Sequence, residues 1–148
     1  MRRYARAMAT YTCSSCDMSV NTTCGHCSAD LVDDGSFFEI KPLFAGELVV
    51  GFARIEGRSV GVVANNSAVR GGVLFSDSAD KAARFLQLCS AHGLPMVSLV
   101  DTPGFMVGPE TEVRAQVRHV SRLFIAAAHL QVPFVAVVLR KGYGLGAM

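Results

Sequence analysis

Four of the five cysteines lie close together near the start of the 148-residue chain and could bind a metal ion. They are Cys13, Cys16, Cys24 and Cys27, in the pattern C-x2-C-x7-C-x2-C. Two C-x-x-C pairs can place four thiolates around one tetrahedral ion, and such a soft sulfur set favours zinc, with iron as the second choice. The segment is rich in Ser, Thr, Asn and Gly and has no core of its own, so a bound metal would supply folding free energy. We therefore expect a zinc-ribbon-like segment over residues 1–32.

Two other interpretations of these cysteines stay open. Cys24-Gly25-His26-Cys27 resembles the active dithiol of disulfide isomerases, but that chemistry requires a helix N-terminus to lower the thiol pKa, within a thioredoxin-like fold. The segment could also be a degenerate remnant that binds nothing. The fifth cysteine, Cys89, stands in an apolar helical pattern, and we expect it in the core.

Two glycine-rich loops are the second place where chemistry is expected. One runs from Asp101 to Gly108 and the other from Gly142 to Met148, each after an apolar segment. Glycine lets a ligand oxygen approach the backbone, and two converging N–H donors can form an oxyanion hole. Either loop alone could be an ordinary turn between a strand and a helix. Together, at adjacent strand ends, they predict a binding site, because ligands of open parallel sheets bind beyond the carboxyl ends of the strands.

A GTPase site is excluded at the first loop. The loop contains the D-x-x-G pattern of GTPases, starting at Asp101. A GTPase would also need G-x-x-x-x-G-K-[ST] upstream and an N-K-x-D segment for guanine, and the sequence has neither.

The elements that must position these loops begin after residue 37. Segments 47–55 and 58–65 are rich in valine and predict a hairpin around Glu56-Gly57. Residues 71–75 are either a short strand or a loop that leads into the next helix. That helix is predicted over 79–92, with Ser76 or Ser78 as its N-cap, Gly93 as its stop and an apolar face of Ala82, Ala83, Leu86 and Cys89.

The second half repeats this order. We predict a buried strand over 95–100, a helix over about 112–130 and another buried strand over 133–139. Arg114, Arg118 and Arg122 would form one stripe of the second helix, interpreted as a solvated face. The alternation of strands and helices predicts an α/β fold with a parallel sheet and right-handed crossovers.

The composition narrows the classes of protein. Hydrophobic residues make up 51% of the chain and charged residues 18%, which excludes a disordered chain. The net charge of +2 gives no strong attraction to nucleic acid. No apolar run reaches the roughly 18–20 residues that span a bilayer, and no secretory signal opens the chain. We expect a cytoplasmic protein without a nucleic-acid or membrane partner, whose low charge leaves some apolar surface for a partner.

The stretch from Asp33 to Met148 resembles the carboxyltransferase β subunits of biotin-dependent acyl-CoA carboxylases, of the propionyl-CoA and acetyl-CoA carboxylase type. The motifs that carry the resemblance are Val49 to Arg54, Gly57 to Asn65, Asp101 to Gly108 and Arg140 to Gly144. It implies a crotonase-like β-β-α superhelix. Residues 33–148 match the early part of the second, biotin-side domain of the family, so we expect an incomplete fold that holds only the biotin half-site.

The resemblance also implies a reaction and a set of site residues. The family passes CO2 from carboxybiotin to the α-carbon of an acyl-CoA, with backbone donors rather than a side-chain nucleophile. Carried over, the amides of Gly144, Leu145 and Gly146 would be oxyanion donors to the ureido oxygen of biotin. Five further residues would line the cofactor site: Gly104, Phe105, Met106, Gly108 and Tyr143. The paired glycines of the family read Gly144-Leu145-Gly146 here.

The implied partners follow from the same resemblance. Lys41, Lys81 and Lys141 are not flanked by methionines as a biotinyl-lysine usually is, so carboxybiotin would come on a separate carrier protein. An acyl-CoA, a biotin carboxylase or biotin carrier subunit and other carboxyltransferase chains in an oligomer would complete the system.

Two alternatives stay beside this interpretation. The chain could be a non-catalytic zinc-binding interaction module with a truncated crotonase-like remnant. It could also be a crotonase-type hydratase or thioesterase that acts on acyl-CoA, with Glu110 or Glu112 as general acid or base. Acidic residues there are more typical of a charged first helical turn, and His119 and His129 of packing or surface positions.

Overall fold

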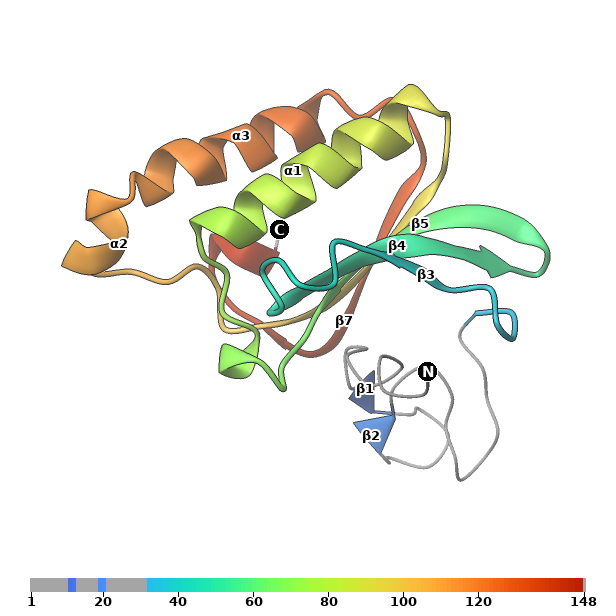
Figure 1. The fold of residues 1–148 in the computed structure, drawn as a ribbon, viewed down its shortest axis with the longest axis horizontal. Coiled ribbons are helices and arrows are strands. Elements are labelled where there is room, and N and C mark those ends of the chain that lie inside the picture. Colours follow the sequence, from blue (N-terminus) through green and yellow to red (C-terminus); the bar gives the residue numbers. More distant parts are fainter. Residues whose placement is uncertain (1–10, 13–18, 21–31, 148) are drawn as a thin grey trace.

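The computed structural model describes residues 11–12, 19–20 and 32–147, and its main unit is a five-stranded sheet in the order β3-β4-β5-β6-β7. The strands are β3 (Phe38–Ile40), β4 (Leu48–Ile55), β5 (Arg58–Asn65), β6 (Met96–Thr102) and β7 (Phe134–Gly142). The helices are α1 (Ser76–Ala91), α2 (Pro109–Val113) and α3 (Gln116–Ala128), with short 3-10 turns η1 (Arg70–Gly72) and η2 (Leu145–Ala147). A separate small sheet pairs β1 (Tyr11–Thr12) with β2 (Ser19–Val20). In Figure 1, α1 and α3 lie side by side over one face of the large sheet.

The sheet is mixed, with an antiparallel half and a parallel half. β4 and β5 form the predicted hairpin, from Leu48 opposite Asn65 to Ile55 opposite Arg58. The turn places Glu56 and Gly57 at φ of 52° and 77°, the left-handed pair of a type I′ turn. β3 adds to β4 antiparallel, whereas β5, β6 and β7 run parallel. The predicted α/β class and the parallel pairing of the later strands are confirmed.

Helix α1 contributes its predicted apolar face to the core. Ala82, Ala83, Leu86 and Cys89 are buried against β4 and β6 residues such as Val50 and Met96. Cys89 is fully buried, which confirms its predicted place in the core, and burial raises the pKa of its thiol to about 11. Gly93 follows the helix at φ 65°, which confirms the predicted stop.

The start of α1 differs from the prediction. The N-cap residue is Phe75, and neither Ser76 nor Ser78 holds that position. Ser78 lies one turn inside the helix, where its hydroxyl accepts the Phe75 N–H at 3.1 Å and donates to the buried Glu47 carboxylate. Ser78 thus caps the helix from its first turn, because its hydroxyl donates to the buried Glu47 carboxylate while it accepts the Phe75 N–H. Residues 71–75 form no strand. Beyond η1 they make a single parallel bridge between Leu74 and Phe105.

The prediction of one long helix over 112–130 is wrong, because the segment forms two helices. Ala115 has φ 54°, in the left-handed region, and accepts the N–H groups of Arg118 and His119 as the first carbonyl of α3. Arg114 belongs to the end of α2, so the predicted stripe of three arginines does not form. Arg122 of α3 instead lies 3.4 Å from the Asp80 carboxylate of α1.

The last strand was predicted to be buried, and this is also wrong. Val135, Val137 and Val138 of β7 are exposed. β7 ends the order of the sheet and pairs with β6 alone, so the described residues leave much of its surface uncovered. Among those residues, no helix is long and apolar enough to cross a membrane. The described residues also hold no cluster of metal-ligating side chains. Cys13, Cys16, Cys24 and Cys27 lie outside the described residues.

Candidate active site

The two glycine-rich loops meet beyond the carboxyl ends of β6 and β7. A Cβ atom added to Gly146 would lie 3.1 Å from the Cα atom of Gly104. One added to Gly104 would lie 3.0 Å from the Tyr143 carbonyl oxygen, and Gly104 itself has φ 111°. Larger residues at either position would force the loops apart. The predicted juxtaposition of the loops is therefore confirmed, and the absence of side chains at Gly104 and Gly146 makes it possible.

Thr102, at the end of β6, fastens the loops to the sheet. Its hydroxyl donates to the Gly72 carbonyl at 2.7 Å and accepts the Gly104 N–H at 3.0 Å. Its carbonyl accepts the Tyr143 N–H from the second loop at 3.2 Å. This fully buried residue was not among the predicted site residues. The signal for it in the sequence was a hydroxyl side chain shortly after the apolar residues of the strand, where such a side chain can bond to nearby backbone groups.

The second loop holds three consecutive backbone donors without an acceptor. Within residues 32–147, no acceptor is found for the N–H groups of Gly144, Leu145 and Gly146, whereas Ala147 donates to the Gly144 carbonyl at 3.3 Å. In the first loop, the Gly104 N–H is bonded to Thr102. The three donors of the second loop are therefore available for a negative oxygen.

The other predicted lining residues divide between the surface and the interior. Met106, Tyr143 and Leu145 have exposed side chains. The Phe105 ring turns inward and packs against Phe124 of α3, with centroids 6.3 Å apart. Gly108, at φ 138°, is the N-cap of α2. The structure thus places Phe105 in the core cluster rather than on the open side of the loop.

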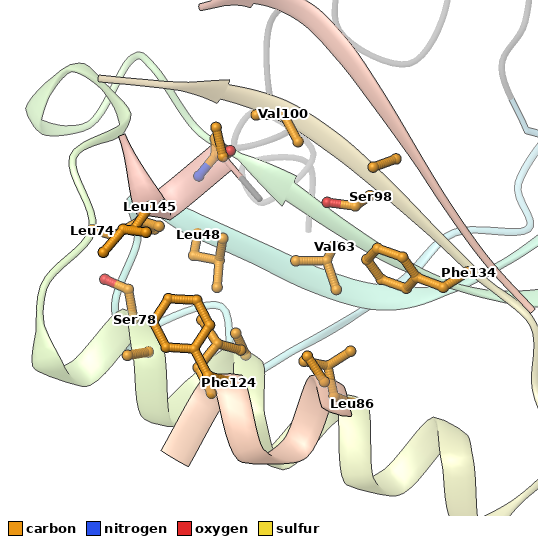
Figure 2. Close-up of a pocket in the computed structure, with 18 of the residues that line it drawn as sticks. Leu48, Val63, Leu74, Ser78, Leu86, Ser98, Val100, Phe124, Phe134 and Leu145 are labelled. Atoms are coloured by element: carbon orange, nitrogen blue, oxygen red, sulfur yellow. The ribbon is translucent and has the colours of Figure 1, made fainter. Parts of the chain in front are cut away.

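An apolar cavity of about 410 Å³ lies directly beneath the two loops, between the sheet and the helices. Figure 2 shows Leu74 and Leu145 at one end of it, Phe134 at the other, and Leu86 and Phe124 on the helix side. Gly146 and Ala147 of η2 also line it. The backbone donors of the second loop therefore lie beside an apolar cavity.

An ion pair lies next to the two loops. The Asp101 carboxylate lies at the end of β6 and is 2.9 Å from the Arg140 guanidinium of β7. The hydrogen bonds that Arg140 donates to the Asp101 carboxylate raise the pKa of Arg140 above its ordinary value, so the guanidinium keeps its charge. The acidic and basic side chains once considered for acid–base chemistry are placed elsewhere. Glu110 and Glu112 are exposed in the first turn of α2, His119 bonds to Asp80 at 2.8 Å, and His129 bonds to the Ile125 carbonyl at 2.8 Å.

Fold and site together define an α/β protein with a backbone-donor site at the ends of two parallel strands. Residues 26–148 match the sequence model of the family described as "Carboxyl transferase domain". The chain belongs to this family.

Two curated relatives illustrate the match. The uncharacterized carboxylase YngE of Bacillus subtilis is 51% identical over 116 residues, which are 78% of this chain and 23% of that protein. The propionyl-CoA carboxylase beta chain of Roseobacter denitrificans is 45% identical over 114 residues, 77% of this chain and 22% of that protein. The chain thus spans between a fifth and a quarter of the length of these relatives.

A solved structure supports the fold. The transcarboxylase 12S structure, described with methylmalonyl-coenzyme A and methylmalonic acid bound, superposes with a TM-score of 0.77 at 43% identity. The match covers 79% of this chain and 23% of that one. The α/β unit therefore corresponds to part of the crotonase-like core of a carboxyltransferase, as the resemblance implied.

Proposed function

We propose that this chain is the biotin-side part of the carboxyltransferase component of a biotin-dependent acyl-CoA carboxylase. The component would transfer CO2 from carboxybiotin to an acyl-CoA. The observation that carries the proposal is the meeting of Gly104 and Gly146, with three backbone donors of the second loop that have no acceptor within residues 32–147. Membership of the carboxyl transferase family supports the same reaction class.

The residues present fit a biotin ureido group. Glycine at positions 104 and 146 lets the two loops come close together, and the neighbouring Leu145 and Gly146 amides, without an acceptor within residues 32–147, would donate to the ureido oxygen. Carboxybiotin, when bound, would supply the CO2 that is transferred and leave biotin behind. The amides of Gly144, Leu145 and Gly146 would stabilise negative charge on the ureido oxygen, and Gly104, Met106, Gly108 and Tyr143 would line the opposite side. No side-chain nucleophile is required, because the chain contributes orientation and hydrogen bonds.

The remaining parts of the reaction would come from partners. A biotin carrier protein would deliver the cofactor after a biotin carboxylase has loaded it, and an acyl-CoA would bind to a surface supplied outside this biotin half-site. The 12S transcarboxylase is described as a hexamer that binds substrate in a multienzyme core. We propose that this chain likewise works with further carboxyltransferase polypeptide.

Biotin binding by the chain itself tests the proposal. Titration of the isotope-labelled chain with free biotin should shift the Leu145 and Gly146 amide resonances. Gly146→Ala should weaken binding roughly tenfold or more, because its Cβ atom would push against Gly104. Gly46→Ala is the matched control, since its Cβ atom would make only ordinary contacts of 3.9 Å with Val69. Absence of shifts in the natural chain, or equal binding by Gly146→Ala, would overturn the proposal.

For the segment 1–32, we propose a structural zinc site formed by Cys13, Cys16, Cys24 and Cys27, ahead of the carboxyltransferase part at 33–148. The paired C-x-x-C spacing supports it. Native mass spectrometry should find one zinc ion per chain, and a chelator should release four thiols. If zinc binds but biotin does not, the alternative function of a zinc-binding interaction module is favoured. If neither zinc nor four protected thiols are found, the zinc proposal fails.

A further inference from the structure

We propose that Asn65, Asp101 and Arg140 are positioning residues for the carboxyltransferase site, a role that rests on the function proposed above. Each lies at or near the carboxyl end of one of three neighbouring parallel strands: Asn65 on β5, Asp101 on β6 and Arg140 on β7. We call this set the strand-end tie. It sets the two glycine loops at the spacing that the site needs.

The tie is a continuous chain of hydrogen bonds across the three strands. The Asn65 side-chain oxygen accepts the Asp101 backbone N–H at 3.1 Å. The Asp101 carboxylate, only 1% exposed, accepts two bonds from Arg140, at 3.3 Å from Nε and 2.9 Å from a terminal nitrogen. This two-point contact fixes the orientation of Arg140 relative to β6 as well as its distance.

The tie lies where the backbone pairing of the sheet is irregular. The parallel register between β5 and β6 ends at Ala64 opposite Leu99. The register between β6 and β7 is interrupted between Val100 and Thr102 and resumes at Thr102 opposite Gly142. Asp101 lies within this interruption, so the tie adds side-chain bonds where the backbone ladder is broken.

The tie is coupled to the loops through immediate neighbours. Thr102, next to Asp101, holds the Gly104 and Tyr143 amides. The Asp101 carbonyl packs against Gly72, where an added Cβ atom would lie 2.5 Å away. Gly146 lies close against Gly104. A shift of β7 along β6 would therefore change the distance between the two loops.

Arg140 is the best residue to change, because it has a matched control. Its side chain is 56% exposed, whereas that of Arg122 is 51% exposed and pairs with Asp80 on the helices, away from the loops. Arg140→Gln strips the buried Asp101 of its partner, and Arg122→Gln removes a comparable surface charge. Arg140→Lys retains the charge but loses the two-point contact.

Hydrogen exchange of single amides is the first measurement. In Arg140→Gln, the loop amides of Met106 and Tyr143 should exchange roughly tenfold faster or more, since a buried unpaired carboxylate favours local opening. Arg140→Lys should give a smaller increase, and Arg122→Gln none. The amides of the β4–β5 hairpin should not change. Unchanged loop amides, or equal acceleration in loops and hairpin, would overturn the positioning role.

Biotin titration of the same chains separates this inference from the proposed function. Arg140→Gln should weaken biotin binding in proportion to the loss of loop protection, with Arg122→Gln as in the natural chain. If the natural chain binds no biotin, the proposed function fails, and the exchange experiment still decides whether the tie orders the loops. If biotin binds equally to Arg140→Gln and the natural chain, the positioning role fails and the proposed function stands.

Discussion

β5 and β7 flank the same central strand, β6, run parallel to it and are both rich in valine, yet their surroundings are opposite. Val60 and Val62 of β5 are 7% and 6% exposed. Val135, Val137 and Val138 of β7 are 57%, 42% and 58% exposed. Helix α1 covers one face of the sheet at β5, where the Cys89 sulfur approaches Gly61, and Phe37 and Leu99 pack on the other. A cavity lies on the helix side of β7. In the large sheet, β7 pairs along one edge only, with β6.

We therefore expect the two sides of the sheet to differ in role, one in stability and the other in binding. The side with β4, β5 and α1 holds the packed core, so substitutions there should act on the free energy of unfolding. The side with β7 holds the glycine loops and exposed apolar residues, so substitutions there should act on binding.

The largest effect is expected on the packed side, at Lys81. This lysine of α1 is almost fully buried, and its ammonium donates to the carbonyls of Phe44, Ala45 and Leu48 at 2.7, 3.3 and 2.7 Å. Lys81→Ala would leave these acceptors unpaired, which should cost about 3–5 kcal/mol of unfolding free energy in urea titrations. Arg84→Ala, at an exposed position of the same helix, should change it by less than about 0.5 kcal/mol. A loss at Lys81 no larger than at Arg84 would contradict the assignment of the core.

A pH-dependent effect is expected next, at Cys89. Burial raises the pKa of its thiol from 9.0 to about 11. Between these values the unfolded chain releases the proton and the folded chain retains it, so stability falls as pH rises. The loss should be on the order of 2 kcal/mol by pH 11. The measurement is the difference between the natural chain and Cys89→Ala, because other groups titrate in both, including Lys81, whose pKa burial lowers. Parallel stability–pH curves for the two chains would refute this explanation.

The sequence predicted the packed side better than the open side, for a physical reason. The turn at Glu56-Gly57, the apolar face of α1 and the stop at Gly93 are local signals, and all three are confirmed. Burial of β7 was predicted from its valines, but composition cannot show which neighbours cover a strand. The break at Ala115 was missed because alanine is a good helix former and gives no local sign of a left-handed backbone.

The candidate site was predictable in part for the same reason. Glycines after apolar strands indicated both loops, and topology brings them together. The buried Thr102 and the pairing of Asp101 with Arg140 depend on register between strands far apart in sequence, which no local pattern fixes. The roles assigned to Gly104, Tyr143 and Gly146 in binding biotin remain predictions.

A stability effect of similar size is expected from an isosteric change on β5. Val62→Thr keeps the shape and the strand preference of valine but buries a hydroxyl among Ala53, Val60 and Leu99. We expect a loss of about 2 kcal/mol, measured by thermal or urea unfolding. Since the substitution changes polarity rather than volume, the loss of unfolding free energy measures how far water is excluded from this side of the sheet. A neutral result would mean that water reaches β5 as readily as β7.

The smallest effect is expected from the same change on β7. Val137→Thr places the hydroxyl on a residue that is 42% exposed, where water can hydrate it, so the free energy of unfolding should change by less than about 0.5 kcal/mol. Val137 lies opposite Leu99 in the pairing of β7 with β6, and Leu99 also contacts the cluster of Val62. The two substitutions therefore test opposite sides of one central strand with one chemical change. A loss at Val137 as large as at Val62 would show that β7 is covered in solution, for example by a second copy of the chain, and a dependence of that loss on protein concentration would identify such association. Equal small losses at any concentration would instead keep β7 as the open side of the sheet.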